Sequence, residues 1–251
     1  MTESNNVVSL EVPQQKALAP LKNGLNWVGP QQPIVGVPYG LEYLVKLDQV
    51  KIERSKEAND SSWDVACKWY VKTVDGDVVF QVFEEPDSRQ TNYLTCSRSR
   101  SYNLHFMDRN HKEVMIVKKE LNSCSDTNKC GCSEASVEAP LGNNIGRMQT
   151  DCSLCSPQFS VVNYESDFAL VIDGPCYSKN CCCSHKFDIR NEEGQNVGRV
   201  VSNYLETKEK DVFTAVDNYT VEIMEELETR QKGALIGTAF LMDILLFHNN
   251  S

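Results

Sequence analysis

The chain has 251 residues, of which 41% are hydrophobic, so it can bury the core of one large β domain or of two small ones. Its net charge of −10 argues against nucleic-acid binding, which requires a basic surface, and against unaided binding to an anionic membrane. The first ten residues carry neither the basic nor the apolar segment of a signal peptide. We therefore expect a cytosolic protein with reduced thiols.

Residues 1–33 are polar and are interrupted by four prolines, Pro13, Pro20, Pro30 and Pro33. They show no sustained hydrophobic period, which predicts a flexible, disordered arm. The arm is either a tail without a function or a short recognition segment. Residues 34–251 are predicted to form one domain, which begins with one or two helical turns over Gly40 to Leu47.

Four pairs of short alternating segments follow, and a polar turn joins the two members of each pair. The pairs are Trp69 to Val74 with Val78 to Phe83, Tyr102 to Phe106 with Val114 to Val117, Phe159 to Tyr164 with Phe168 to Ile172, and Phe187 to Ile189 with Val197 to Val201. Many short strands with polar turns are typical of a β-sandwich or a β-barrel. Closure into a barrel would remove the exposed edges and leave a wide interior to be filled.

Gly233 to Phe247 is an apolar stretch that is interrupted only by Thr238 and Asp243. A surface helix keeps one polar face, and this stretch has none. One interpretation is a helix over residues 232–248 that fills the barrel, with Gly233 and Gly237 allowing close approach of other backbone. The other is a membrane span, although a span needs about 20 apolar residues and an aspartate is costly in lipid. The predicted fold is therefore mainly β, a closed antiparallel β-barrel around a central hydrophobic C-terminal α-helix.

Four short stretches carry a resemblance to a known family. They are Tyr39 to Leu44 with Asp48-Gln49 after it, Ala139 to Gly142 followed by Ile145-Gly146, Asp173 to Cys176, and Phe240 to Asp243. In this order, from about Val37 to Phe247, the chain resembles the phospholipid scramblases. The resemblance implies the tubby-like fold of that family, in which a closed β-barrel surrounds a C-terminal helix.

The resemblance also implies a function, which is ATP-independent, bidirectional movement of phospholipids between membrane leaflets, triggered by calcium. Such a protein is not an enzyme, and it acts at the cytoplasmic face of the plasma membrane. The alternative is a membrane-anchored module of the same fold that binds lipid or protein without transport. The chain contains no G-x-x-x-x-G-K-[ST], H-E-x-x-H or G-x-S-x-G motif. The family's basic nuclear-import stretch would fall near residues 198–204, where only Arg199 is basic, so nucleic-acid binding is not expected.

In the family, the calcium segment lies just before the terminal helix, at residues 215–226 here. Calcium prefers six to eight oxygen ligands, including carboxylates and a main-chain carbonyl at regular loop positions. The resemblance implies five ligands, namely Asp217, Tyr219, Val221, Ile223 and Glu226. The site is expected to be weak, because Ala215 replaces an aspartate and Thr220 replaces the glycine of the sharp turn. The alternative is a solvated acidic stretch without a metal.

Nine of the eleven cysteines fall between Cys124 and Cys183. The family has a palmitoylated, cysteine-rich stretch at the first of these positions, and exposed thiols beside basic residues suit S-acylation. The candidate acylation sites are Cys124, Cys130, Cys132, Cys181, Cys182 and Cys183. The alternative is a zinc site, because the pairs Cys130-x-Cys132 and Cys152-x-x-Cys155 supply four thiolates.

Overall fold

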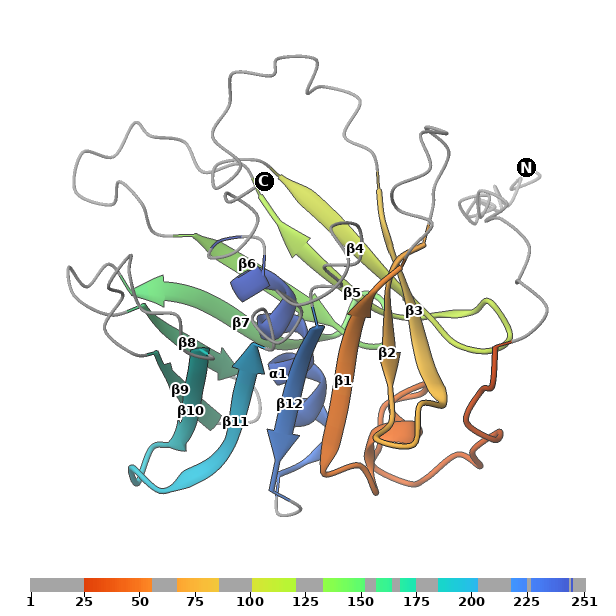
Figure 1. Cartoon of the computed structure of the whole chain (residues 1–251), viewed down its shortest axis with the longest axis horizontal. Coiled ribbons are helices and arrows are strands. Elements are labelled where there is room, and N and C mark those ends of the chain that lie inside the picture. The colour runs from red at the N-terminus through yellow and green to blue at the C-terminus, as the bar shows by residue number, and fades with distance from the viewer. Residues whose placement is uncertain are drawn as a thin grey trace, which may run out of the picture.

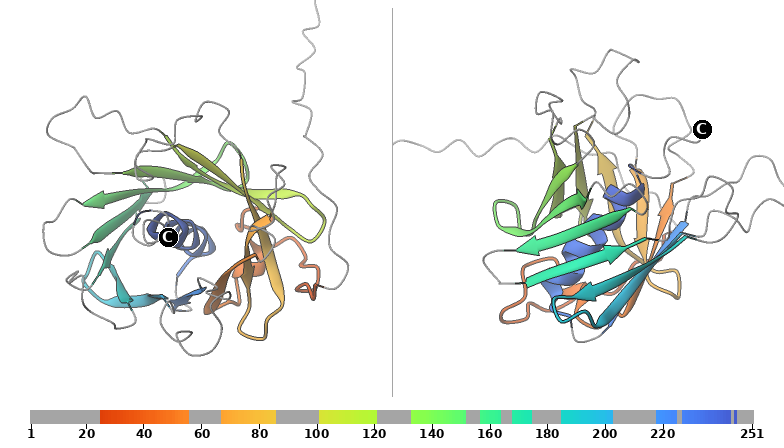
Figure 2. Two further views of the ribbon diagram at one scale, coloured as in Figure 1. Left: turned by 45° about the horizontal axis from the view of Figure 1, so that its top comes forward. Right: turned by 90° about the vertical axis from the view of Figure 1, so that its left-hand side faces the viewer.

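The computed structural model describes residues 25–55, 67–85, 101–120, 133–151, 157–163, 168–174, 185–202, 218–224 and 227–243, together with Leu245. Within this part of the chain, twelve strands form a ring and one α-helix runs inside the ring (Figure 1). A second view, into the open end of the ring, shows the helix surrounded by strands (Figure 2).

The fold begins with a short 3-10 helix, η1 (Glu42–Leu44). The strands are β1 (Gln49–Arg54), β2 (Cys67–Lys72), β3 (Val78–Glu84), β4 (Tyr102–Met107), β5 (Glu113–Lys119), β6 (Glu134–Glu138), β7 (Asn144–Asp151), β8 (Gln158–Asn163), β9 (Phe168–Asp173), β10 (His185–Asn191), β11 (Asn196–Ser202) and β12 (Asn218–Ile223). The last element is α1 (Thr229–Met242). Each strand pairs antiparallel with the next along the chain, and β12 pairs with β1, which closes the barrel.

All four predicted hairpins are confirmed, as β2–β3, β4–β5, β8–β9 and β10–β11. Alternation of side chains determines which face of each strand is buried. In β9, for example, Phe168, Leu170 and Ile172 are buried, and the residues between them are partly exposed. Gly76 and Gly194 adopt positive φ in two of the tight turns, a conformation that glycine takes without steric cost. Four strands were not predicted, namely β1, β6, β7 and β12.

The predicted closed barrel around a C-terminal helix is confirmed, and α1 is buried along nearly its whole length. Residues 232–242 and Leu245 are buried by the barrel. The helix begins at Thr229, three residues before the predicted start at 232, and α1 ends at Met242 within the described residues. The predicted end at 248 lies outside the described residues. No helix in the described part of the chain combines the length and the hydrophobicity that crossing a bilayer requires. The interpretation as a core helix is therefore correct for this structure.

Two glycines of α1 lie where the barrel wall leaves little room for a side chain. A methyl group on Gly237 would lie 2.9 Å from Val137 of β6, and one on Gly233 would lie 3.0 Å from Ile145 of β7. On another side of the helix, the ring of Phe240 packs edge-on against Trp69 and Phe106, at centroid distances of 5.5 and 5.2 Å. Small residues thus face one part of the wall and a large aromatic residue fills the space toward another.

The two ends of the barrel differ in their connections. Short turns at residues 73–77, 108–112, 139–143 and 192–195 lie at one end, which we call the turn end. The opposite end, where β1, β3, β5, β7, β9 and β11 finish, carries the longer connections, and we call it the loop end. In Figure 1, β1 points toward the loop end and β12 toward the turn end. The helix α1 starts at the turn end, directly after β12, and runs toward the loop end.

The predicted arm, residues 1–33, overlaps the described residues only from 25 onward. Asn26 and Val28 exchange main-chain hydrogen bonds with Val78, at 2.8 and 3.0 Å, next to a bridge between Trp27 and Val78. This part of the arm therefore contacts the start of β3. The domain boundary at residues 33 and 34, and the character of residues 1–24, remain predictions.

Candidate functional site

The first candidate site is the segment predicted to bind calcium, whose middle forms β12. This strand pairs with β1 on one side and with β11 on the other. The side chains of Tyr219, Val221 and Ile223 are buried in the barrel core, and Glu222 is exposed on the outer face. The segment is thus part of the barrel wall over residues 218–223.

Three of the five predicted calcium ligands can be placed. Val221 lies opposite Val50 of β1 and Val200 of β11, so its main chain is part of the strand pairing. Tyr219 and Ile223 direct their side chains inward and supply no carboxylate. The two carboxylates that the prediction requires, Asp217 and Glu226, lie outside the described residues. Calcium binding therefore depends on these two side chains and stays a prediction.

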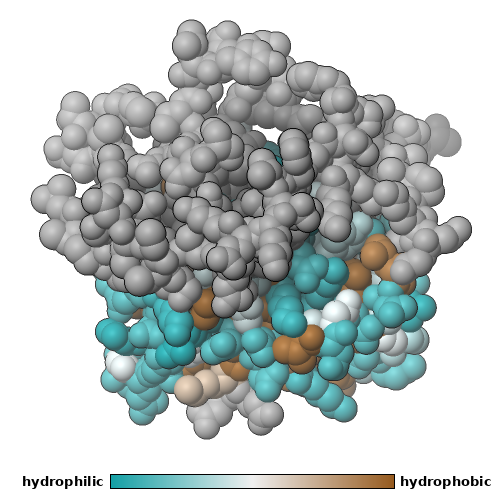
Figure 3. Space-filling model, in the orientation of Figure 1, coloured by the Kyte–Doolittle hydropathy of each residue, from teal (hydrophilic) through white to brown (hydrophobic). Residues whose placement is uncertain are grey.

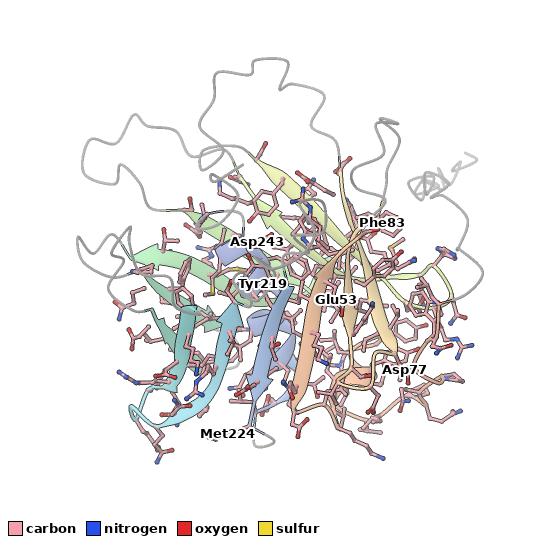
Figure 4. The ribbon with its side chains drawn as sticks, viewed as in Figure 1. Glu53, Asp77, Phe83, Tyr219, Met224 and Asp243 are labelled. Carbon is pink, nitrogen blue, oxygen red and sulfur yellow. The ribbon has the colours of Figure 1, made fainter. Side chains whose placement is uncertain are left out.

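Tyr219 connects this strand to the helix. Its hydroxyl donates a hydrogen bond to Oδ1 of Asp243, and the two side chains meet inside the barrel (Figure 4). Asp243 is the C-cap of α1 and is only 5% exposed. A carboxylate at this depth is costly without a hydrogen-bond donor, so the contact explains how an otherwise apolar stretch tolerates an aspartate.

Lys232 makes the corresponding contact near the start of α1. It is 1% exposed, and its Nζ donates to three main-chain carbonyls that precede β1, those of Leu44, Val45 and Leu47, at 3.3, 3.2 and 2.9 Å. The carbonyls around the end of η1 point at the ammonium group, and charge-assisted hydrogen bonds of this kind offset the cost of burying a cation. The segment before β1 is thereby fixed to the helix.

The chain segments that contain the cysteines all start and finish at one end of the barrel. Cys67 is the first residue of β2, at the loop end, and every other cysteine falls in a chain segment that leaves and rejoins the barrel there. These segments connect β3 to β4, β5 to β6, β7 to β8 and β9 to β10. The predicted acylation sites and the four cysteines of the alternative zinc site, Cys130, Cys132, Cys152 and Cys155, themselves lie outside the described residues.

Metal binding elsewhere receives no support from the described residues. Within them, no group of three or more histidine, cysteine, aspartate or glutamate side chains could hold a metal ion. The four cysteines of the alternative zinc site are not among the described residues, so the zinc site stays a prediction.

The outer face of the barrel carries ion pairs between neighbouring strands. Nδ1 of His105, on β4, lies 2.7 Å from Oε1 of Glu113, on β5, and this hydrogen bond raises the pKa of His105 although burial opposes the shift. Burial alone would raise the pKa of Glu138, but hydrogen bonds from Lys118 and from the main chain of Gly142 lower it. These contacts join adjacent strands, which is a structural role.

Several exposed apolar side chains of the described residues lie at the turn end of the barrel. The described face in Figure 3 is mostly hydrophilic, with separate hydrophobic spots. Among the described residues, the large hydrophobic side chains that are exposed lie at the turn end or in the segment that leads to β1, namely Ile34, Val35, Tyr39, Val74, Leu141 and Met224.

Comparison with known proteins identifies the family. Residues 27–249 match the family model described as Scramblase, and the chain belongs to the scramblase family. It is 28% identical to human phospholipid scramblase 1 over 90% of this chain and 71% of that protein. It is 29% identical to human phospholipid scramblase family member 5, over 87% and 80% of the two chains, and 26% identical to bovine phospholipid scramblase 2, over 88% and 75%. No solved structure matches.

Sequence reasoning named Tyr219 and Asp243 as separate site residues and did not pair them. Lys232 was not among the predicted site residues. A lone aspartate in such a stretch signals that a hydrogen-bond donor must come from elsewhere in the fold. The identity of that donor depends on the register of β12, which the residue pattern did not reveal.

Proposed function

We propose that this protein moves phospholipids between the two leaflets of a membrane, in both directions and without ATP. The observation that supports this function is the match of residues 27–249, which include the entire described barrel, to the scramblase family. The relatives named above are phospholipid scramblases. The absence of a G-x-x-x-x-G-K-[ST] loop from the sequence agrees with transport that does not use ATP.

Movement of a phospholipid across a bilayer is slow because its polar headgroup must cross hydrocarbon. A protein can lower this barrier without covalent chemistry, by giving the headgroup a polar or thinned path. The interior of the barrel is filled by α1 and by apolar side chains. We therefore place the lipid path outside the barrel wall and not through its centre.

We further propose that the loop end faces the cytoplasmic leaflet of the plasma membrane. The segments that carry the predicted acylation sites leave and rejoin the barrel at this end, and acylation of two cysteines would anchor the protein stably, whereas one acyl chain gives only reversible binding. Acyl anchors would also compensate for the repulsion between an anionic membrane and a protein with a net charge of −10.

Transport is tested in liposomes that carry a fluorescent phospholipid in both leaflets. With the purified protein in the membrane, an external quencher should reach lipid that started in the inner leaflet, and no ATP should be needed. Leu241→Asp, which is expected to unfold the domain, controls for effects on the liposomes that do not need folded protein. Quenching equal to that of protein-free liposomes, at full incorporation of folded protein, would exclude transport.

We also propose that calcium stimulates the transport through Asp217 and Glu226. Calcium should increase the transport rate of the natural protein, and Asp217→Ala should reduce the increase. Glu222→Gln is the control, because Glu222 lies in the same segment on the outer face of β12 but is not a predicted ligand. Identical calcium titrations of the natural protein and Asp217→Ala would remove the calcium proposal and leave transport standing.

Acylation is tested by treating cell membranes with hydroxylamine, which cleaves thioesters. The protein should move from the membrane fraction to the soluble fraction, and substitution of Cys130, Cys132 and Cys181 to Cys183 by serine should have the same effect. Cys67→Ser, which leaves the predicted acylation sites intact, is the control. An unchanged distribution after hydroxylamine would show that thioesters do not hold the protein at the membrane.

A second function is favoured by the burial of α1. A barrel that keeps its helix inside is a rigid scaffold and offers no internal path, so the protein could bind lipid or protein at the membrane without transport. In the liposome assay this function predicts stable co-sedimentation of the folded protein with the liposomes and no additional quenching.

A further inference from the structure

The barrel closes between its first and last strands, and this seam differs from every other strand pair. We define the seam as the pairing of β1 with β12, from Gln49 opposite Glu222 to Glu53 opposite Asn218. At its turn end, the main-chain N–H of Ile223 donates to the carbonyl of Asp48, at 2.6 Å. All other neighbouring strands are also neighbours in the sequence, so the chain itself keeps them close. Only non-covalent contacts hold the seam.

The helix is attached to both sides of this seam. At one end, Lys232 binds the three carbonyls of the segment that leads into β1. At the other end, Asp243 accepts the hydrogen bond from Tyr219 of β12. The residues between these anchors are apolar or, like Thr238, bonded within the helix, since its hydroxyl donates to the carbonyl of Ala234 at 2.8 Å. Lys232 and Asp243 therefore each contact a segment that adjoins the seam.

The spacing of the anchors matches the length of the seam. Lys232 and Asp243 are separated by about 16 Å along a helix that rises about 1.5 Å per residue. A strand such as β12, with six residues, extends over about 17 Å at about 3.4 Å per residue. One anchor thus lies at the turn end of the seam and the other toward its loop end, and Figure 4 shows Tyr219 and Met224 at opposite ends of β12.

We propose that α1 is an internal staple for the seam between β1 and β12, and that this seam is where the barrel opens. Release of either anchor removes polar contacts that stabilise a buried charged side chain, which favours movement of the helix end together with the adjoining strand. An open seam would expose two unpaired strand edges and the apolar interior. This inference does not rest on lipid transport. Because β12 belongs to the predicted calcium segment, a calcium ion bound there would act on the seam.

The test is amide hydrogen exchange of the full-length purified protein, measured by mass spectrometry. Tyr219→Phe removes one hydroxyl and keeps the ring, and Lys232→Met removes the ammonium group and keeps most of the aliphatic stem. Each variant should accelerate exchange of residues 49–54 and 218–223 by about tenfold or more, the effect of losing a hydrogen bond to a charged group. The β6–β7 hairpin, on the opposite side of the ring, should change much less.

Val161→Ala is the matched control, because Val161 is completely buried in β8 and truncating it leaves both anchors intact. It should accelerate exchange in the seam and in the β6–β7 hairpin alike. If Tyr219→Phe also accelerates the two regions equally, or leaves the seam unchanged, the anchors contribute only to overall stability and the proposal is wrong. If Lys232→Met does not fold, Tyr219→Phe decides the question, since it removes a single oxygen atom.

Discussion

Replacement of Leu241 by aspartate is expected to unfold the whole domain, without any membrane present. Leu241 is completely buried between α1 and the barrel wall. An unpaired carboxylate in such an interior costs several kcal/mol, which is comparable with the total stability of about 5–15 kcal/mol of a typical domain. Far-ultraviolet circular dichroism and size-exclusion chromatography of the purified variant measure the loss of strands and of compactness.

Two controls separate this effect from general sensitivity of the helix. Leu241→Met keeps the volume and the apolar character, and should cost less than about 1.5 kcal/mol. Arg230→Asp places the same new charge at an exposed position of α1 and should change stability by only about 0.5 kcal/mol. A folded and soluble Leu241→Asp protein would contradict the central position of the helix.

The second large effect is expected at Gly40, in the segment before η1. Gly40 has a φ of +87°, and a Cβ atom there would lie 2.3 Å from Cβ of Val114 on β5. Gly40→Ala combines a left-handed backbone, which costs about 1–2 kcal/mol for other residues, with overpacking of about 1–3 kcal/mol. We expect urea denaturation to show a loss of about 2–5 kcal/mol.

Gly76→Ala is a matched control for Gly40→Ala. Gly76 has nearly the same φ, +93°, but a Cβ atom there would meet nothing within 4 Å. Gly76→Ala should therefore cost only the conformational part, about 1–2 kcal/mol. Val114→Gly removes both Val114 atoms that the new Cβ would meet at 2.3 Å, and it should rescue part of the loss when it is combined with Gly40→Ala. Equal destabilisation by the two glycine variants would show that contact with β5 does not matter.

The architecture could be predicted where local pattern and turn chemistry agreed. Asp75-Gly76, for instance, separates two alternating segments, and the structure has β2 and β3 on either side of it. The burial of α1 could be predicted because a helix without a polar face needs a surrounding wall. The missed strands have weaker patterns. In β7, Gly146 and Arg147 interrupt the apolar residues, and Gly146 is required because Ala234 of the helix packs directly against it.

The candidate site was less predictable than the fold. Calcium-loop positions were assigned by resemblance along residues 215–226, but residues 218–223 form a strand with partners on both sides. Alternation along a strand would have placed the side chains of Tyr219, Val221 and Ile223 on one face of the sheet. The contact between Tyr219 and Asp243 could not be predicted, because it joins elements whose relative position only the closed barrel defines.

Closure of the barrel by its last strand has a consequence for biosynthesis. A ribosome releases β1 long before β12, so the earlier strands must wait with two open edges and no helix inside. Pairing between residues so distant in sequence forms late in folding, and exposed strand edges favour aggregation during the delay. We therefore expect newly made chains to depend on chaperones until β12 and α1 have left the ribosome and can complete the ring.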